Sequence, residues 1–278
     1  SVFEFKKIIG PLTDPKKYGL DDRICFDVIA PSIPGFGFSA SPPKPYGPRK
    51  VANYFNKLMT KNLGYKKYYA QGGDWGGAIV SWLAADFEKN CKGIHLNIMI
   101  MRDKNGIQNN KEEIWKNKFI KEQVMEEGYR AIQSTRPNTL AFAMLDNPVG
   151  VAAWIVEKLY SWSDLKNKNL FSRYSKDEVI NSIMIYLVTN SFLSSSWIYY
   201  GRRVEGGRIL NYNEKKIKIP TACALFPKEF LSWPPRSYVE RIYNVVQWSK
   251  FLKGGHFAAM EEPNLIVKDI RKFIKKII

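Results

Sequence analysis

The chain has 278 residues, of which 45% are hydrophobic and 14% are aromatic. This composition suits one large globular domain, or a core domain with an inserted one, and excludes a disordered chain. The formal net charge of +17 leaves three interpretations open: nucleic-acid binding, peripheral contact with an anionic membrane, and a solvated basic surface. The lysines are scattered and no nucleic-acid-binding motif accompanies them. We therefore expect no nucleic-acid partner and take the solvated surface as the default.

The three cysteines, Cys25, Cys91 and Cys223, are far apart and form no CxxC pair. This pattern argues against a disulfide framework and a structural zinc site, and it is typical of a reducing, cytosol-facing setting. We expect no membrane span and no signal peptide in the printed sequence. Because it opens with Ser1 rather than Met, we expect a processed or incomplete version of a longer chain.

The first part of the chain alternates apolar runs with helical periodicity. We expect strands at residues 24–30, 66–71 and 93–101, and helices at residues 51–63 and 78–88. This alternation predicts parallel strands with right-handed crossovers.

Helical patterns dominate residues 102–212, with helices expected at 114–127, 149–160 and 176–193. Afterwards we expect a strand at 219–225, a short helix at 239–242, a strand at 243–248 and an amphipathic helix at 263–277. The predicted fold is α/β: a mostly parallel, doubly wound sheet with an inserted α-helical cap. The core comprises residues 1–101 and 213–278, and the cap comprises residues 102–212.

Residues 72–76, Gly-Gly-Asp-Trp-Gly, lie between an expected strand and an expected helix. A nucleophile in such a strained turn needs small neighbours so that strand and helix can approach, and we expect Gly72 and Gly76 to meet this need. With Asp74 as the nucleophile, the covalent intermediate is an alkyl ester and the electrophile is a carbon of an epoxide or an alkyl halide. The simpler interpretation is an aspartate that caps a helix.

The remaining catalytic candidates follow from chain order. His95 lies inside an apolar strand and is expected to be a core residue, whereas His256 follows Gly-Gly in a loop before the last helix, where a general base belongs. Glu229 follows the strand at 219–225 and is the candidate acid that orients the base. Asp86 and Asp103 are poorer candidates, one in a predicted helix and one at the start of the insert.

Opening an epoxide also requires a proton donor for the leaving oxygen, and tyrosine hydroxyls in a cap suit this role. The residues themselves do not select among the tyrosines of the insert, which are Tyr129, Tyr160, Tyr174, Tyr186, Tyr199, Tyr200 and Tyr212.

Five segments together resemble the microsomal-type epoxide hydrolases, including the insect juvenile hormone epoxide hydrolases, within the α/β-hydrolase superfamily. These are APSIPGFGFS at 30–39, QGGDWG at 71–76, GIHLN at 93–97, DNPVG at 146–150 and GGHFAA at 254–259. The resemblance implies that Asp74 is the nucleophile, His256 the base and Glu229 the orienting acid. It matches the two epoxide-oxygen donors to Tyr129 and Tyr199, with Tyr200 as the alternative to Tyr199, and makes the backbone of Trp75 an oxyanion donor.

The resemblance further implies an ether hydrolase that converts lipophilic epoxides, xenobiotic or juvenile-hormone-like, to vicinal diols with water. It implies no cofactor, no metal, and a location at the cytosolic face of the endoplasmic reticulum membrane. The family's His-Gly-x-Pro motif, which supplies a second oxyanion donor, its first strands and its membrane anchor are expected before Ser1. The stretch from Asp74 to Tyr129 is shorter than the resemblance implies.

Two alternatives stay open at this point. One is a catalytically impaired relative that binds hydrophobic ligands without turnover. The other is a haloalkane dehalogenase, which shares the Asp, His and acid machinery but would use halide-binding donors such as Trp where this cap offers tyrosines.

Overall fold

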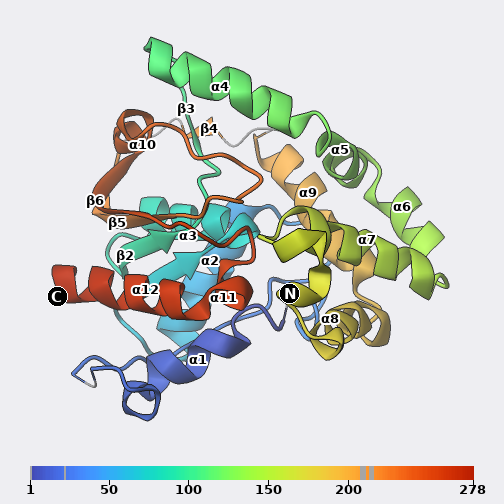
Figure 1. The fold of residues 1–278 in the computed structure, drawn as a ribbon, viewed down its shortest axis with the longest axis horizontal. Coiled ribbons are helices and arrows are strands. Elements are labelled where there is room, and N and C mark those ends of the chain that lie inside the picture. The colour runs from blue at the N-terminus through green and yellow to red at the C-terminus, as the bar shows by residue number, and fades with distance from the viewer. Residues whose placement is uncertain (1, 22, 207–210, 213–215) are drawn as a thin grey trace.

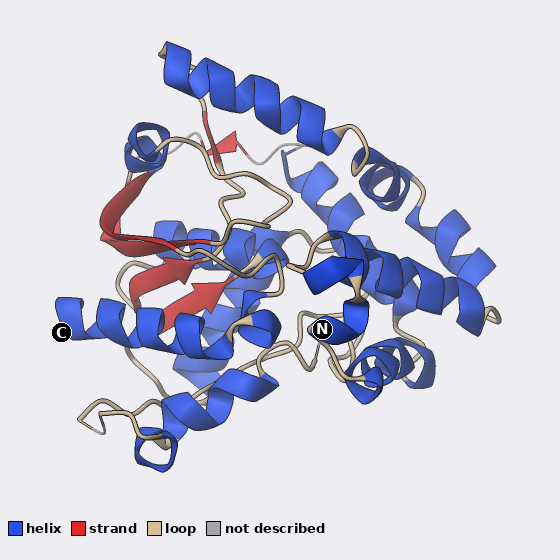
Figure 2. Ribbon diagram, viewed as in Figure 1, coloured by secondary structure: helices blue, strands red, loops and turns tan. Residues whose placement is uncertain are grey.

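The computed structural model describes residues 2–21, 23–206, 211, 212 and 216–278. Within them the main sheet has four parallel strands in the order β1-β2-β5-β6, shown in Figure 2. The strands are β1 (Tyr68–Gly72), β2 (Cys91–Leu96), β5 (Ile217–Leu225) and β6 (Tyr243–Lys250). Gln71 pairs with His95, which pairs with Ala222, so the three strands end at a common edge. Active sites of open parallel sheets lie at this carboxyl edge.

Helices cover both faces of the sheet because strand side chains alternate between two apolar cores. On β5, Cys223 packs in one core with helix α3 (Asp74–Asp86) and helix α2 (Pro48–Lys57). Its neighbours Ala222 and Ala224 pack in the other core with helix α12 (Pro263–Ile277) and helix α1 (Lys6–Thr13). The expected doubly wound α/β fold is therefore confirmed (Figure 1).

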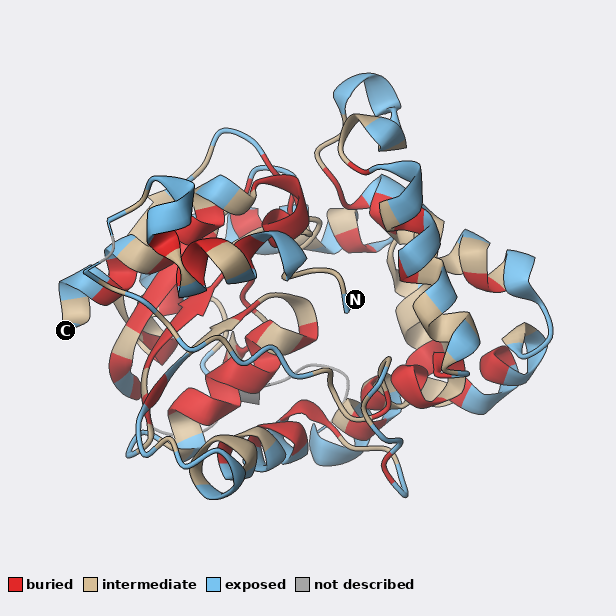
Figure 3. Cartoon of the chain, turned by 90° about the horizontal axis from the view of Figure 1, so that it is seen from below, coloured by how far each residue is buried: buried red, intermediate tan, exposed pale blue. Residues whose placement is uncertain are grey.

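The chain between β2 and β5 forms a largely helical insert beside the sheet (Figure 1). Its short strands β3 (Arg102–Asp103) and β4 (Asn211–Tyr212) pair in parallel. Its helices are α4 (Asn110–Gln123), α5 (Glu127–Thr135), α6 (Pro137–Met144), α7 (Pro148–Ser161), α8 (Lys176–Val188) and α9 (Phe192–Gly206), with 3₁₀ turns at Lys166–Lys168 and Leu170–Ser172. Buried residues concentrate in the sheet and its covering helices, whereas the helices of the insert alternate between buried and exposed residues (Figure 3).

The expected strand at residues 24–30 does not form, and this prediction was wrong. The segment has no regular secondary structure, although it is apolar and β-branched. A strand needs a neighbour to complete its ladder, and within the described residues β1 pairs only with β2. Phe26 and Val28 line the same cavity as Tyr68 and Ala70 of β1. Among the described residues the segment therefore packs beside the sheet without forming a ladder with it.

Most other elements form close to their expected positions, with shifted ends. The helix expected at 78–88 begins four residues earlier, because Asp74 itself starts α3. The strand expected at 93–101 ends at Leu96. The helix expected at 176–193 is broken, since Asn190 adopts a left-handed conformation with φ of 50° between α8 and α9. Residues 51–63 form α2 and a π-helical turn at Leu58–Asn62.

The last third of the chain alternates strands and helices as predicted. Helix α10 (Arg236–Ile242) precedes β6, and the short helix α11 (Ala258–Glu261) precedes α12. Helix α12 has the predicted bounds and buries Ile266, Ile270 and Phe273. Near the N-terminus a 3₁₀ turn covers Pro15–Tyr18.

In the part of the chain that the structure describes, no single helix is long and apolar enough to cross a membrane. Only α6 and α7 taken together meet that criterion, by length and composition, and they are bent by 120°.

Candidate active site

Asp74 occupies a strained turn between β1 and α3. Its φ of 43° lies in the left-handed region that non-glycine residues seldom adopt. A Cβ atom on Gly72 would lie 2.3 Å from the backbone carbon of Gly76, so only glycine lets the end of the strand approach the helix this closely. The turn therefore has the backbone geometry of the predicted nucleophile elbow.

The expectation that Gly76 also needs to be small was wrong. A Cβ atom there would meet nothing within 4 Å, because the close approach uses only the backbone of this residue. The tight contact lies one residue later, where a Cβ on Gly77 would come within 2.7 Å of the Ile98 side chain.

The side chains of Asp74, His256 and Glu229 come together in one hydrogen-bonded line. His256 Nε2 lies 3.3 Å from Asp74 Oδ2. Its Nδ1 lies 3.0 Å from both carboxylate oxygens of Glu229. His256 and Glu229 are buried, whereas the Asp74 side chain is 44% exposed. The arrangement has a nucleophile candidate facing the cavity and an orienting carboxylate sealed behind the imidazole.

The two carboxylates determine the charge of His256. Burial lowers the pKa of the imidazole, but Glu229 and Asp74 outweigh burial and raise that pKa well above 6.5. Near neutral pH the ring is therefore protonated, and it donates from Nδ1 to Glu229 and from Nε2 to Asp74.

The loops after β5 and β6 hold these residues against each other. Lys228 N–H donates to the Gly254 carbonyl at 3.1 Å, which ties the loop of Glu229 to the loop of His256. Trp162, from the insert, stacks on Phe230 with ring centroids 4.0 Å apart and meets the His256 ring edge-on at 5.1 Å. Aromatic rings thus shield the imidazole from water. Nothing in the sequence pattern distinguishes Trp162 from the other aromatic residues of the insert.

Tyr129 and Tyr199 line the same cavity as Asp74 and Trp75 of the elbow. Their ring centroids are 5.9 Å apart, and Tyr199 meets the Trp75 ring edge-on at 4.7 Å. Burial is the main factor that raises the pKa of each hydroxyl, and the charge of Asp74 raises both further. Both hydroxyls therefore remain protonated at neutral pH.

The other tyrosines differ in position. Tyr186 also lines the cavity. Tyr174 is buried with its hydroxyl 2.6 Å from Ser163 Oγ. Tyr160 and Tyr200 are exposed, and Tyr200 lines a separate surface pocket beside Trp197. The side chain of Tyr212 lies outside what the structure describes. Of the adjacent pair, Tyr199 alone lines the cavity with Asp74.

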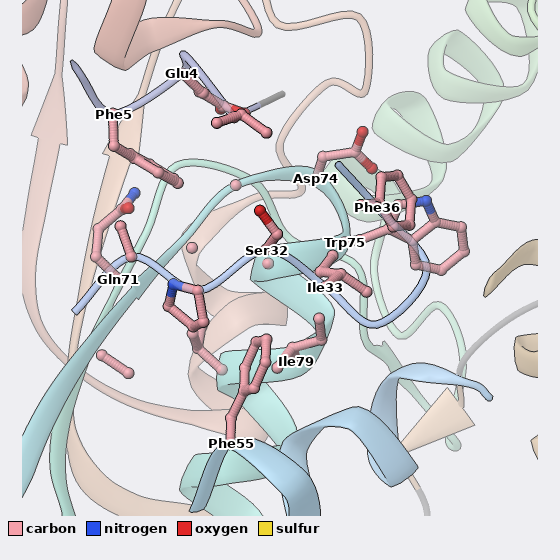
Figure 4. Close-up of a pocket in the computed structure, with 18 of the residues that line it drawn as sticks. Glu4, Phe5, Ser32, Ile33, Phe36, Phe55, Gln71, Asp74, Trp75 and Ile79 are labelled. Atoms are coloured by element: carbon pink, nitrogen blue, oxygen red, sulfur yellow. The ribbon is translucent and has the colours of Figure 1, made fainter. Parts of the chain in front are cut away.

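The catalytic candidates open onto a cavity of about 650 Å³. Figure 4 shows Asp74 and Trp75 beside the segment that carries Ser32, Ile33 and Phe36. Trp154, Tyr186 and Phe192 of the insert line the same space. Its walls are mainly apolar with few polar groups, which suits a lipophilic ligand.

The first N–H groups of α3 point towards the elbow without intrahelical partners, since a helix leaves its first donors free. The backbone N–H of Trp75 is one of them, and the N-cap residue Gly73 supplies no side-chain cap. Helix N-termini stabilise negative charge.

Among the described residues, no group of three or more His, Cys, Asp or Glu side chains is arranged to hold a metal ion.

His95 and the two rejected acids have structural partners. His95 is buried, with Nε2 3.0 Å from Asp269 Oδ2, so the prediction of a core histidine is confirmed. Asp86 forms an ion pair with Arg49 at 2.7 Å, and Asp103 is paired with Arg241.

Comparison with known proteins agrees with this geometry. Residues 17–263 match the family model of the alpha/beta hydrolase fold. The chain belongs to the α/β-hydrolase fold family.

Within that family its relatives are epoxide hydrolases, which confirms the resemblance drawn from the motifs. The chain is 38% identical to epoxide hydrolase 1 of Sus scrofa, with 98% of the chain aligned. It is 36% identical to juvenile hormone epoxide hydrolase 2 of Ctenocephalides felis, with 100% aligned. These matches span 65% and 64% of the two relatives. The crystal structure of juvenile hormone epoxide hydrolase from the silkworm Bombyx mori superposes with a TM-score of 0.85 at 30% identity, covering all of this chain and 70% of that one.

Proposed function

We propose that the chain hydrolyses lipophilic epoxides to vicinal diols through an ester of Asp74. The observation that carries this proposal is the pairing of Asp74 with the buried His256–Glu229 couple at 3.3 Å and 3.0 Å, opposite two protonated tyrosines. An aspartate nucleophile forms an ester with an electrophilic carbon. The relatives named epoxide hydrolases support the same chemistry.

In the first step an Asp74 oxygen attacks a carbon of the epoxide ring, and the bond between that carbon and the epoxide oxygen breaks. Tyr129 and Tyr199 donate hydrogen bonds to the departing oxygen, and one of them transfers its proton. Because the cavity is apolar and the hydroxyls are buried, these hydrogen bonds act in a low dielectric, where they are stronger than in water.

In the second step His256 acts as a base. Esterification removes the negative charge of Asp74, one of the two charges that raise the pKa of His256. That pKa therefore falls when the ester forms, and the imidazole releases its proton, which restores the tyrosine that was deprotonated in the first step. The neutral ring then deprotonates a water molecule, which attacks the carboxyl carbon of Asp74. The Trp75 N–H stabilises the oxyanion. When the ester bond breaks, the imidazole returns the proton that it took from water to the departing oxygen, and the diol leaves.

We propose substrates of the size and polarity of terpenoid or xenobiotic epoxides. The support is the apolar lining of a cavity of about 650 Å³ and the insect relatives, which are named juvenile hormone epoxide hydrolases.

The proposal is tested by diol formation from a terminal alkyl epoxide, with Asp74→Ala and His256→Asn beside the unaltered chain. Both variants are expected to lose diol formation, while His256→Asn traps the ester on Asp74. Undiminished diol formation by Asp74→Ala would refute the proposal.

Two further measurements separate the alternatives. Binding of the epoxide without ester or diol would favour a ligand-binding relative. Release of halide from a matching alkyl halide, with no diol from the epoxide, would favour a dehalogenase.

We also propose peripheral contact with the cytosolic face of the endoplasmic reticulum membrane. The net charge of +17 supports contact with anionic lipid. The exposed face of α12 is basic, with Lys268, Lys272 and Lys275 all solvent-exposed.

A further inference from the structure

Glu261 holds the backbone on both sides of His256. Its Oε2 accepts the N–H of Gly255 at 3.0 Å, and its Oε1 accepts the N–H of Phe257 at 3.0 Å. Oε2 also accepts the N–H of Asp164, an insert residue, at 2.7 Å. The carboxylate is buried, and its two oxygens bracket the residue that carries the imidazole.

The insert contacts the same loop directly. His256 N–H donates to the Trp162 carbonyl at 2.9 Å. Gly254 N–H donates to Asp164 Oδ2 at 2.9 Å. A Cβ atom on Gly255 would lie 2.5 Å from the Trp162 carbonyl oxygen, so the two backbones touch. Every N–H from residue 254 to residue 257 is thus held by the insert or by Glu261, at the junction where α11 meets the insert (Figure 1).

These bonds fix the place from which the imidazole reaches Asp74. The Nε2 to Oδ2 separation of 3.3 Å is already at the long end of hydrogen bonding. A small displacement of the loop therefore breaks this contact or misaligns the ring for attack on a water molecule. Displacements of about 1 Å in a catalytic group can cost about 100-fold in rate.

We propose that Glu261 is a positioning residue for the general base, linking the insert to the loop that carries His256. This inference rests on the proposed function, because it assigns Glu261 to the ester-hydrolysis step. Ring opening uses Asp74 and the two tyrosines and does not require the base. Loss of Glu261 therefore slows the second step and leaves the first nearly unchanged.

Glu261→Gln is the sharpest variant. The glutamine side chain has the same size, but its NH₂ group cannot accept a hydrogen bond. One of the backbone N–H groups that now donate to Glu261 would therefore meet another donor and lose its hydrogen bond. Glu262→Gln is the matched control. Glu262 is the next residue and equally buried, yet the partners of its carboxylate among the described residues are the side chains of Arg173 and Lys253, each at 2.8 Å.

The first measurement does not depend on turnover. The 278-residue chain has two histidines, so ring signals from this chain labelled with ¹⁵N-histidine resolve His95 and His256 separately. Glu261→Gln is expected to shift or broaden the His256 signals and to lower the pH at which they titrate, with the His95 signals unchanged. Glu262→Gln is expected to leave both unchanged. His256 signals that are identical in all three proteins would overturn the proposal.

The second measurement follows the two steps with decene oxide by rapid quenching and mass spectrometry of the Asp74 peptide. In Glu261→Gln, ester formation is expected to stay within about 2-fold, while ester hydrolysis falls by about 10- to 100-fold and the ester accumulates. An equal fall of both steps, or equal effects of the two variants, would overturn the proposal. If the unaltered chain forms no ester, the proposed function fails, and the histidine signals alone decide the role of Glu261.

Discussion

At the scale of single residues, the position of Tyr199 relative to Tyr200 gives a direct test of the ring-opening step. The two neighbours carry the same hydroxyl, but Tyr199 lies against Trp75 inside the cavity and Tyr200 lies in a surface pocket. Tyr199→Phe is expected to slow ester formation by about 10- to 100-fold, because one of two proton donors is lost. Tyr200→Phe should remain within about 2-fold. Rapid-quench kinetics measure both, and equal effects would contradict the assignment.

The meeting of Asp74, His256 and Glu229 could be expected from the sequence, because short local patterns mark these residues as catalytic candidates. Asp74 has glycines around it, and His256 follows a Gly-Gly pair in the loop before the last helix. Glu261 and Trp162 were not predictable. They act through backbone hydrogen bonds and ring contacts between segments about 100 residues apart, and no local pattern records such contacts.

At the scale of elements, the elbow predicts opposite outcomes for two glycines. In Gly72→Ala the new methyl group would lie 2.3 Å from the backbone of residue 76, so strand and helix must separate. We expect a loss of about 2 kcal/mol or more in the free energy of unfolding. In Gly76→Ala the methyl group meets open space in a helix, and the better helix propensity of Ala should stabilise by up to about 1 kcal/mol. Urea unfolding compares the two, and a stable Gly72→Ala protein would contradict this account of the turn.

The helix α11 and its Glu261 predict a pH dependence of stability. Burial raises the pKa of this carboxyl to about 7, and its three backbone donors only partly offset that effect. Because the folded state holds the proton more tightly than the unfolded chain, this contribution is present in full below pH 4.5 and is lost as the pH rises through 7. The loss amounts to about 3 kcal/mol.

Glu261→Gln cannot titrate, so it isolates this term. The free energy of unfolding of the unaltered chain, relative to the variant, should decrease between pH 5 and pH 8. A difference that is constant, or that grows with pH, would contradict the raised pKa.

Element prediction failed where pairing decides the outcome. Residues 24–30 have the composition of a buried strand, but a strand forms only beside a partner, and among the described residues they pair with none. The bounds of α12 were predicted correctly because Pro263 starts the helix and an apolar stripe runs along its length. The bounds of a helix can be predicted from residues within it, whereas a strand forms only if a segment far away in the chain pairs with it.

At the scale of the whole molecule, the distribution of basic residues predicts which surface would contact an anionic membrane. The exposed face of α12 carries Lys268, Lys272 and Lys275, while its one acid, Asp269, is buried. Replacing the three lysines by Gln is expected to weaken binding to phosphatidylserine-containing vesicles by about 10-fold or more, with the effect vanishing at high salt.

The matched control removes the same charge from α4, at the exposed Lys111, Lys116 and Lys118. That helix also carries acids, including the exposed Glu113, so its replacement should weaken vesicle binding less. Co-sedimentation measures both proteins. Equal losses would show that net charge alone, and not the face of α12, determines the contact.

The central claim is that Asp74 forms and releases an ester, and isotope placement in ¹⁸O-water tests it most directly. In a single turnover the diol takes its new oxygen from Asp74 and should carry no label, while the Asp74 peptide gains one ¹⁸O when water attacks its carboxyl carbon. Labelled diol from that first turnover together with an unlabelled Asp74 peptide would mean that water attacks the epoxide directly, and would contradict the account.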